Sequence, residues 1–105
     1  MHYNVAFAPE AQDQLTELYH YIAHANAPVV AQRYVDAIIT YCESLSISPH
    51  RGAQRDDIRP GLRITHYKKR AVIAFAVKAT QVTVLGVFYG GQDYETALQD
   101  DDPLA

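Results

Sequence analysis

The stretch from Ala71 to Val77 is the feature that most limits how this chain can fold. It reads Ala-Val-Ile-Ala-Phe-Ala-Val, without a polar residue at any position. Successive side chains of a strand point to opposite faces of a sheet, so a strand without polar residues is normally buried on both faces. A chain of 105 residues can build one modest core. The sequence therefore predicts a single domain in which this strand is central.

Apolar spacing elsewhere in the chain predicts the order of the other elements. Residues 2–7 alternate as a strand does, while the apolar residues from Pro9 to about Ala25 and from Pro28 to about Ser46 recur at helical spacing. Both prolines suit a first helical position. Further strands are expected over residues 62–67, 70–78 and 81–89. The order βααβββ predicts an α+β fold, with a helical hairpin packed on one face of a small, mainly antiparallel sheet.

The second face of that sheet needs a cover of its own. We expect one domain over residues 1–93, followed by an acidic tail over residues 94–105. A helical hairpin covers only one face, so the tail, a second copy of the chain or a different protein must cover the other. The tail offers few residues that could pack, namely Tyr94, Ala97, Leu98 and Leu104. A partner protein is therefore the expected cover.

Charge is segregated along the chain, although the net charge is only −3. The balance is −4 over residues 1–50, +5 over residues 51–70 and −5 over residues 93–105. Seven of the nine Lys and Arg residues fall in the middle block, and Lys68 and Lys69 form a predicted hairpin turn. Local potential steers charged partners more than net charge does. Direct binding of nucleic acid therefore stays an open possibility.

The sequence has no feature of export or membrane insertion. No apolar run approaches the ~20 residues that span a bilayer. The N-terminus lacks the basic segment and long apolar stretch of a secretory signal. A single cysteine, Cys42, excludes an internal disulfide framework. We therefore expect a cytoplasmic protein that has no membrane contact.

No residue pattern in the sequence predicts a site for a metal or another cofactor. His20 and His24 share a helix face with Asp13 and Glu17, but that face lies opposite the apolar one and lacks a convergent third ligand. Cys42 falls on the apolar arc of the second helix with no base beside it, so it is expected to be a buried hydrophobic residue. The glycines match no phosphate-binding loop. We expect no cofactor.

The basic block contains residue types that could cleave RNA. Such a reaction needs groups that take a proton, donate a proton and stabilise developing charge. Arg63, His66, Lys69 and Tyr89 are of these types. Alternation, however, places Arg63, Thr65 and Tyr67 on one strand face and Leu62, Ile64 and His66 on the other. Tyr67 and Tyr89, near strand ends, are the strongest interface candidates among the eight tyrosines.

Several short motifs follow one another along the chain, and their order and spacing are specific when they are taken together. They are Phe7-Ala8-Pro9-Glu10-Ala11, Leu18-Tyr19-His20-Tyr21-Ile22, Ala31-Gln32-Arg33-Tyr34, Pro49-His50-Arg51-Gly52, Arg59-Pro60-Gly61-Leu62-Arg63, Val72-Ile73-Ala74-Phe75 and Val84 to Asp93. In this order the chain resembles the ParE branch of the RelE/ParE toxin superfamily over about residues 3–93. The resemblance implies the toxin of a type II toxin–antitoxin system, associated with plasmid stabilisation and neutralised by a ParD-like or related antitoxin.

The resemblance also implies a target and a set of site residues. ParE-like toxins poison DNA gyrase without chemistry of their own, and here Arg59, Leu62, Arg63 and Tyr89 are expected to bind the target. We expect the antitoxin to contact Ile39, Ile73, Phe75 and Val77. The alternatives are a RelE-like ribosome-dependent mRNA endoribonuclease that uses Arg63, His66, Lys69 and Tyr89, or an inactive toxin homologue. The gyrase branch is favoured because the last predicted strand has no basic residue and the tail is acidic.

Overall fold

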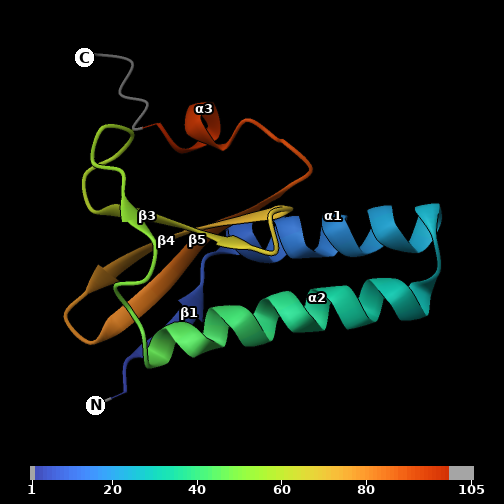
Figure 1. Cartoon of the computed structure of the whole chain (residues 1–105), viewed down its shortest axis with the longest axis horizontal. Coiled ribbons are helices and arrows are strands. Elements are labelled where there is room, and N and C mark those ends of the chain that lie inside the picture. The colour runs from blue at the N-terminus through green and yellow to red at the C-terminus, as the bar shows by residue number, and fades with distance from the viewer. Residues whose placement is uncertain (1, 100–105) are drawn as a thin grey trace.

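A computed structural model describes residues 2–99 (Figure 1). Its elements are β1 (Asn4–Phe7), α1 (Pro9–Ala25), α2 (Pro28–Glu43), the 3-10 turn η1 (Ser44–Ser46), β2 (Ala53–Gln54), β3 (Leu62–Tyr67), β4 (Ala71–Lys78), β5 (Gln81–Tyr89) and α3 (Tyr94–Leu98). The five strands form one sheet in the order β1-β5-β4-β3-β2. Only the β1–β5 pair is parallel. The predicted α+β class is confirmed, and β2 and α3 are additions to the expected order.

The two long helices begin where the prolines predicted. Pro9 and Pro28 occupy the first turns of α1 and α2, where the missing backbone N–H leaves no helical hydrogen bond unmade. The second helix was expected to reach Ser46, but α2 ends at Glu43 and the chain tightens into η1. There the Ser44 hydroxyl donates to the carbonyl of Tyr41. A serine side chain that bonds to a carbonyl of the preceding turn often marks a bend or end of a helix.

The main core lies between the helical hairpin and one face of the sheet. Ile38 of α2 and the strand residues Ile73, Phe75, Val82 and Val84 are fully buried there. Figure 1 shows α1 and α2 side by side against the sheet, with α3 lying apart from them. The apolar stretch of β4 therefore supplies side chains to this core, as the sequence predicted.

The second face of the sheet is covered by the chain itself, so the expectation of a partner as its cover is wrong. A separate cluster of buried residues on this side is made by Leu62, Ile64, Ala74, Phe88 and Leu98. Leu98 belongs to α3 and is only 6% exposed, and Tyr94 packs its ring 6.2 Å from that of Phe88. Leu104, also considered for packing, lies outside the described residues.

Polar contacts explain why an acidic segment can hold this position. Asp93 caps α3 by accepting a hydrogen bond from the Thr96 amide at 3.2 Å. Arg55 donates to Glu95 at 2.7 Å and to Asp57 at 2.9 Å, which ties α3 to the loop before β3. The short helix therefore combines two apolar contacts with an ion pair, and composition alone did not reveal this arrangement.

The turn between β3 and β4 has an unusual backbone. Lys68 and Lys69 both have positive φ, 52° and 67°, and the Arg70 amide donates to the Tyr67 carbonyl at 3.3 Å. Positive φ at both central residues is the signature of a type I′ turn, which strongly favours Asn-Gly. Side chains other than Gly, Asn or Asp hold this conformation at a cost of about 1–3 kcal/mol each.

Candidate functional site

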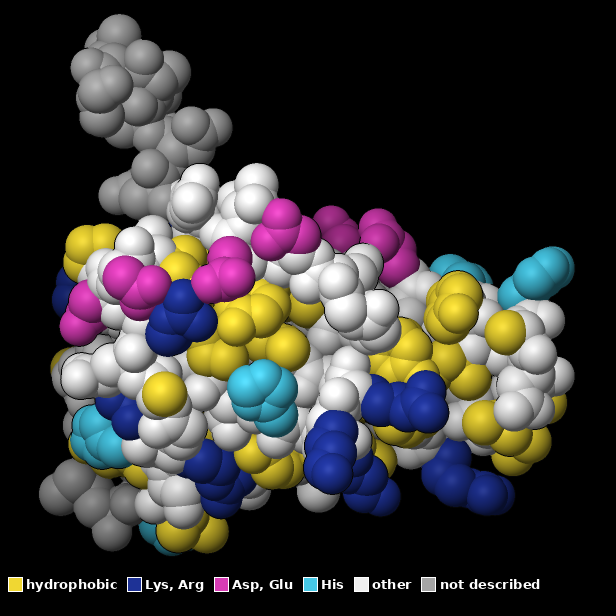
Figure 2. Space-filling model, turned by 45° about the horizontal axis from the view of Figure 1, so that its top comes forward, with side chains coloured by type: hydrophobic (Ala, Val, Ile, Leu, Met, Phe, Trp, Pro, Cys, Tyr) yellow, Lys and Arg dark blue, Asp and Glu magenta, His cyan; other side chains and the backbone are white. Residues whose placement is uncertain are grey.

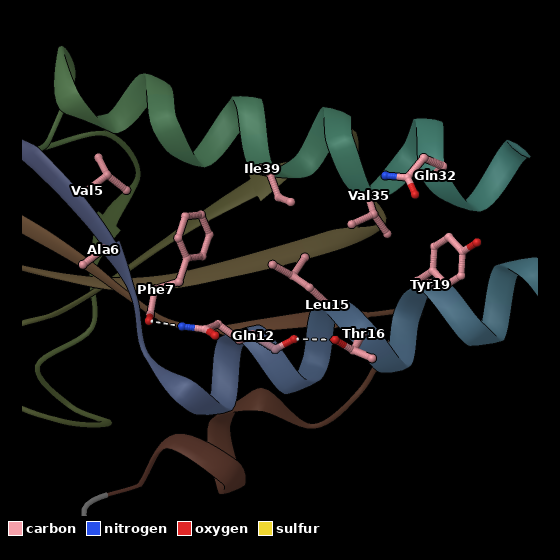
Figure 3. A pocket seen from close by; sticks show the side chains of 10 residues that line it. All are labelled: Val5, Ala6, Phe7, Gln12, Leu15, Thr16, Tyr19, Gln32, Val35 and Ile39. Carbon is pink, nitrogen blue, oxygen red and sulfur yellow. Dashed lines mark hydrogen bonds between the residues drawn. The ribbon is translucent and has the colours of Figure 1, made fainter. Parts of the chain in front are cut away.

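An apolar groove opens between β1, α1 and α2. Its volume is about 610 Å³. Figure 3 shows Phe7, Leu15, Val35 and Ile39 pointing into the space between the two helices and the strand. The remaining lining residues are Val5, Ala6, Gln12, Thr16, Tyr19 and Gln32. The groove is thus an apolar surface with a polar margin, a form that suits an apolar protein segment.

The polar margin of the groove is satisfied within the chain. Gln12 donates its side-chain amide to the Phe7 carbonyl at 3.0 Å, and the Thr16 hydroxyl donates to the Gln12 carbonyl at 3.1 Å (Figure 3). Gln32 donates to Asp36 at 2.8 Å. These contacts hold the polar side chains at the margin, so the floor of the groove presents carbon atoms.

Strand β1 borders the groove, and its outer edge is partly occupied, because the Tyr3 amide donates to Ser46 and the Phe7 carbonyl accepts from Gln12. Its Asn4 amide and the following Ala8 amide donate to Thr80 and Val84 carbonyls at 2.8 and 2.9 Å, toward β5. Backbone groups alternate in direction along a strand, so those of Val5 point away from the sheet. β1 is the terminal strand among the described residues. An extended segment could therefore bond to the backbone of Val5 while its side chains enter the groove.

The residues expected to contact an antitoxin lie at different depths. Ile39 lines the groove and is partly buried. Ile73 and Phe75 are fully buried in the main core and present no surface to a partner. Val77 is partly buried on the same side of the sheet, and Val82 of β5 separates it from Val5 of β1. The structure thus brings only Ile39 of this set to the groove.

Arg63 is engaged by the chain's own backbone. Its guanidinium donates to the carbonyls of His50, Arg51 and Gly52, the last two at 3.4 Å. Arg51 in turn donates to the Ser44 hydroxyl at 2.8 Å and lies 5.0 Å from the centre of the Tyr41 ring. Arg63 therefore positions the loop over residues 50–52, because one planar fork meets several carbonyls there.

The other residues expected at the target surface are dispersed. Leu62 is fully buried in the second cluster, beneath α3. Arg59 is partly exposed in the loop before β3. Tyr89 lies at the end of β5, where it pairs with Ala71 at the far end of β4 from Arg63's partner Phe75. The four residues do not form one contiguous site.

The set considered for RNA cleavage is not gathered either. Arg63 and Tyr67 lie on the face of β3 that meets the helices, while the exposed His66 lies on the other face with Leu62. This facing of β3 is as the alternation predicted. Lys69 is in the β3–β4 turn, at the same end of the sheet as Tyr89. No acid–base pair therefore adjoins Arg63 in the described part of the chain.

A group of tyrosines lies at this end of the sheet. The Tyr34 ring is 6.1 Å from that of Tyr67 and 5.7 Å from that of Tyr89, and Tyr67 is also 5.2 Å from Tyr41. Burial raises the pKa of Tyr34, the neighbouring Tyr89 and Tyr67 raise it further, and Arg70 opposes them. The sequence singled out Tyr67 and Tyr89 but missed Tyr34, whose helical position does not reveal which strand end it faces.

The remaining candidates for chemistry are unremarkable in their surroundings. Cys42 is fully buried, and burial raises the pKa of its thiol to about 12. Residues 2–99 contain no group of three or more His, Cys, Asp or Glu side chains placed to hold a metal ion. Within the same residues, no helix has the length and apolar character needed to cross a bilayer. These findings leave the surfaces for protein binding as the features to explain.

In this chain, two helices packed on a mostly antiparallel open sheet match the class of RelE/ParE-like folds. Its structure is similar to that of a chain from the chromosomal ParDE toxin–antitoxin system of P. aeruginosa (TM-score 0.73, 20% identity, 83% of this chain and 95% of that chain covered). It is also similar to a chain of the RelBE2 toxin–antitoxin complex of Mycobacterium tuberculosis (TM-score 0.64, 19% identity, 86% and 100% covered).

The sequence decides the family within that class. Residues 5–94 match the family model of the ParE toxin of the type II toxin–antitoxin system parDE. The chain belongs to this family and is a ParE-type toxin of a type II toxin–antitoxin system. No curated protein matches the chain.

Proposed function

We propose that this toxin inhibits DNA gyrase by binding it, performs no chemistry of its own, and is neutralised by a cognate ParD-like antitoxin. Membership of the ParE family carries the proposal. The geometry supports it, because the guanidinium of Arg63 is occupied by three backbone carbonyls and His66 lies on the opposite face of β3. A phosphate-cleaving site would need such groups to converge on one atom.

The groove between β1, α1 and α2 is the proposed antitoxin site. Its apolar floor suits a segment that lays an apolar face into the groove, and the backbone of Val5 at the edge of β1 could bond to that segment. Both structural relatives come from toxin–antitoxin systems, which supports a partner of this kind. We propose that Ile39 contacts the antitoxin directly. Ile73 and Phe75, which belong to the same core cluster as Leu15 and Val35, would support the floor from beneath.

The proposed gyrase-binding surface includes Arg59 and the loop over residues 50–52. In this arrangement Arg63 acts as a positioning residue, because its hydrogen bonds fix that loop. Leu62 would support the same region from the second core cluster. Tyr89 lies at the other end of the sheet, so it would belong to a second part of the contact.

Gyrase assays with purified toxin test the proposed target. We expect loss of supercoiling and accumulation of cleaved DNA as toxin is added. Arg63→Ala should weaken inhibition more than Lys78→Gln, which removes a charge from the exposed end of β4. Unaffected supercoiling at large toxin excess would contradict the proposal. Cut mRNA and arrested translation would then indicate the RelE-like alternative, and the absence of any effect would indicate an inactive homologue.

A binding assay with the tagged cognate antitoxin tests the groove. Ile39→Asp places a charge in the apolar groove and should weaken antitoxin binding at least tenfold, since an unpaired carboxylate must lose its water there. Val29→Asp is the matched control, because Val29 lies on α2 and is 62% exposed away from the groove lining. Equal affinity of the two variants would exclude this groove as the antitoxin site.

A further inference from the structure

The β3–β4 turn carries positive charges that its backbone conformation does not require. Lys68 and Lys69 occupy the two positions with positive φ, where Asn-Gly would form the same turn with less strain. Strained positions occupied by unfavourable residues are a recognised mark of function. With Arg70, three consecutive exposed cations stand at the tip of this hairpin. We name Lys68, Lys69 and Arg70 the basic turn.

The basic turn is not neutralised by carboxylates of the described chain. Both ion pairs within residues 2–99 are made by Arg55, toward Asp57 and Glu95. Figure 2 shows the acidic side chains along one margin of the molecule and a gathering of Lys and Arg side chains on the opposite part of the same face. The segregation seen along the sequence is therefore also a segregation in space, which favours an anionic partner.

Contacts with aromatic side chains and with the backbone hold the basic turn in a fixed position. The Lys68 ammonium lies 5.5 Å from the centre of the Tyr67 ring, and the Gly90 amide donates to the Arg70 carbonyl at 3.1 Å. Tyr67 is held in turn by Tyr34 and Tyr41. The cations thus project from an ordered hairpin, and less freedom is lost when they bind. Glu17 on α1 shares a hollow with Tyr89 and limits the cationic surface on that side.

We propose that the basic turn binds the sugar–phosphate backbone of duplex DNA, without selecting a base sequence. Lys and Arg supply the charge that phosphate contacts require, and contacts to phosphate carry no sequence information. The choice of DNA over other polyanions rests on the proposed function, because a toxin that binds gyrase meets the duplex on which gyrase acts. In that setting the groove and the loop over residues 50–52 bind proteins, and the basic turn binds the DNA beside them.

The decisive variant is Lys68→Asn combined with Lys69→Gly. It removes two charges and installs the preferred residues for the turn, so its midpoint of urea unfolding should rise and misfolding cannot explain a loss of binding. Binding is measured by fluorescence anisotropy of a short labelled DNA duplex, with toxin alone, over a series of salt concentrations. The slope of log affinity against log salt is negative, and its magnitude should fall by about 1.8, because each of the two lost phosphate contacts contributes about 0.9.

Control measurements separate this site from other causes. Lys78→Gln removes a charge at the other end of β4 and should leave the slope unchanged. Gyrase inhibition by the same proteins is measured separately, so a toxin that binds DNA but spares gyrase would contradict the proposed function and leave the DNA site standing. Unchanged affinity and slope in the double variant would overturn the proposal. Tighter binding of single-stranded RNA than of duplex DNA by the unaltered toxin would also overturn it.

Discussion

Replacement of Gly52 by alanine tests how closely the loop over residues 50–52 packs on β3. Gly52 has φ +79°, and a Cβ built there would lie 2.2 Å from the carbonyl oxygen of Ile64 and 3.0 Å from Cβ of Thr65. Gly61 has nearly the same φ, +80°, and a Cβ there would meet no atom within 4 Å. Gly61→Ala is therefore a matched control that carries the backbone strain without the collision.

The structure gives the size of the expected difference. Alanine in the left-handed region costs about 1–2 kcal/mol at either position. Gly52→Ala must also move the loop from β3, which adds about 1–3 kcal/mol for overpacking and weakens the Arg63 hydrogen bonds to the loop carbonyls. We expect the free energy of unfolding to fall by about 1 kcal/mol for Gly61→Ala and by about 3–4 kcal/mol for Gly52→Ala.

Urea unfolding followed by circular dichroism measures both variants. A double-mutant cycle with Arg63→Ala adds a second criterion, because Arg63→Ala should cost less in the Gly52→Ala background, where its contacts are already weakened. Equal losses of stability for Gly52→Ala and Gly61→Ala would refute the close packing of this loop on β3. Strict additivity with Arg63→Ala would refute the role of Arg63 in positioning the loop.

Three further predictions concern the core and α3. Leu98→Ala should lower the free energy of unfolding by about 2 kcal/mol, which is the low end for a buried leucine because α3 is short. Ala97→Ser, at an exposed position of α3, should change it little. Equal effects of the two substitutions would show that α3 does not cover the sheet. Cys42 should resist alkylation in native toxin at pH 8 and react after unfolding, since burial raises its pKa to about 12; rapid native labelling would contradict this. Hydrogen bonds from Thr96 lower the pKa of Asp93, so its stabilisation of α3 is present above the unfolded pKa of about 3.9 and is lost as pH falls below it. The protection of the amides over residues 94–98, taken relative to their intrinsic exchange rate at each pH, should therefore fall on acidification, and Asp93→Asn should flatten that dependence.

Much of the fold could be predicted because its signals are local. The prolines at the starts of α1 and α2 and the alternation of β3 depend on backbone geometry within a few residues. The family resemblance, carried by motifs spread over nearly the whole chain, agreed with the ParE toxin family. Ile39, which we expected to contact the antitoxin, lines the groove, and the contact itself stays a prediction.

Other features depend on contacts between distant segments. The two apolar residues of α3, Tyr94 and Leu98, look insufficient as a cover for the sheet. An ion pair between Arg55 and Glu95, 40 residues apart in the chain, also holds α3 in place. Arg63 looks like a free anion-binding group until the loop over residues 50–52 presents its carbonyls. Neither arrangement leaves a periodic signal in the sequence.

The sequence by itself determined which side chains share a face of each strand and helix, since this follows from the repeat of the local backbone. Tertiary structure alone decided which of those faces remained exposed to solvent and to partners. It paired β1 with β5 in parallel and left an edge beside the groove, closed the second face of the sheet with α3, and occupied Arg63 within the chain. Whether a polar group is free to bind a partner depends on which distant groups reach it first, and only the folded chain brings those groups together.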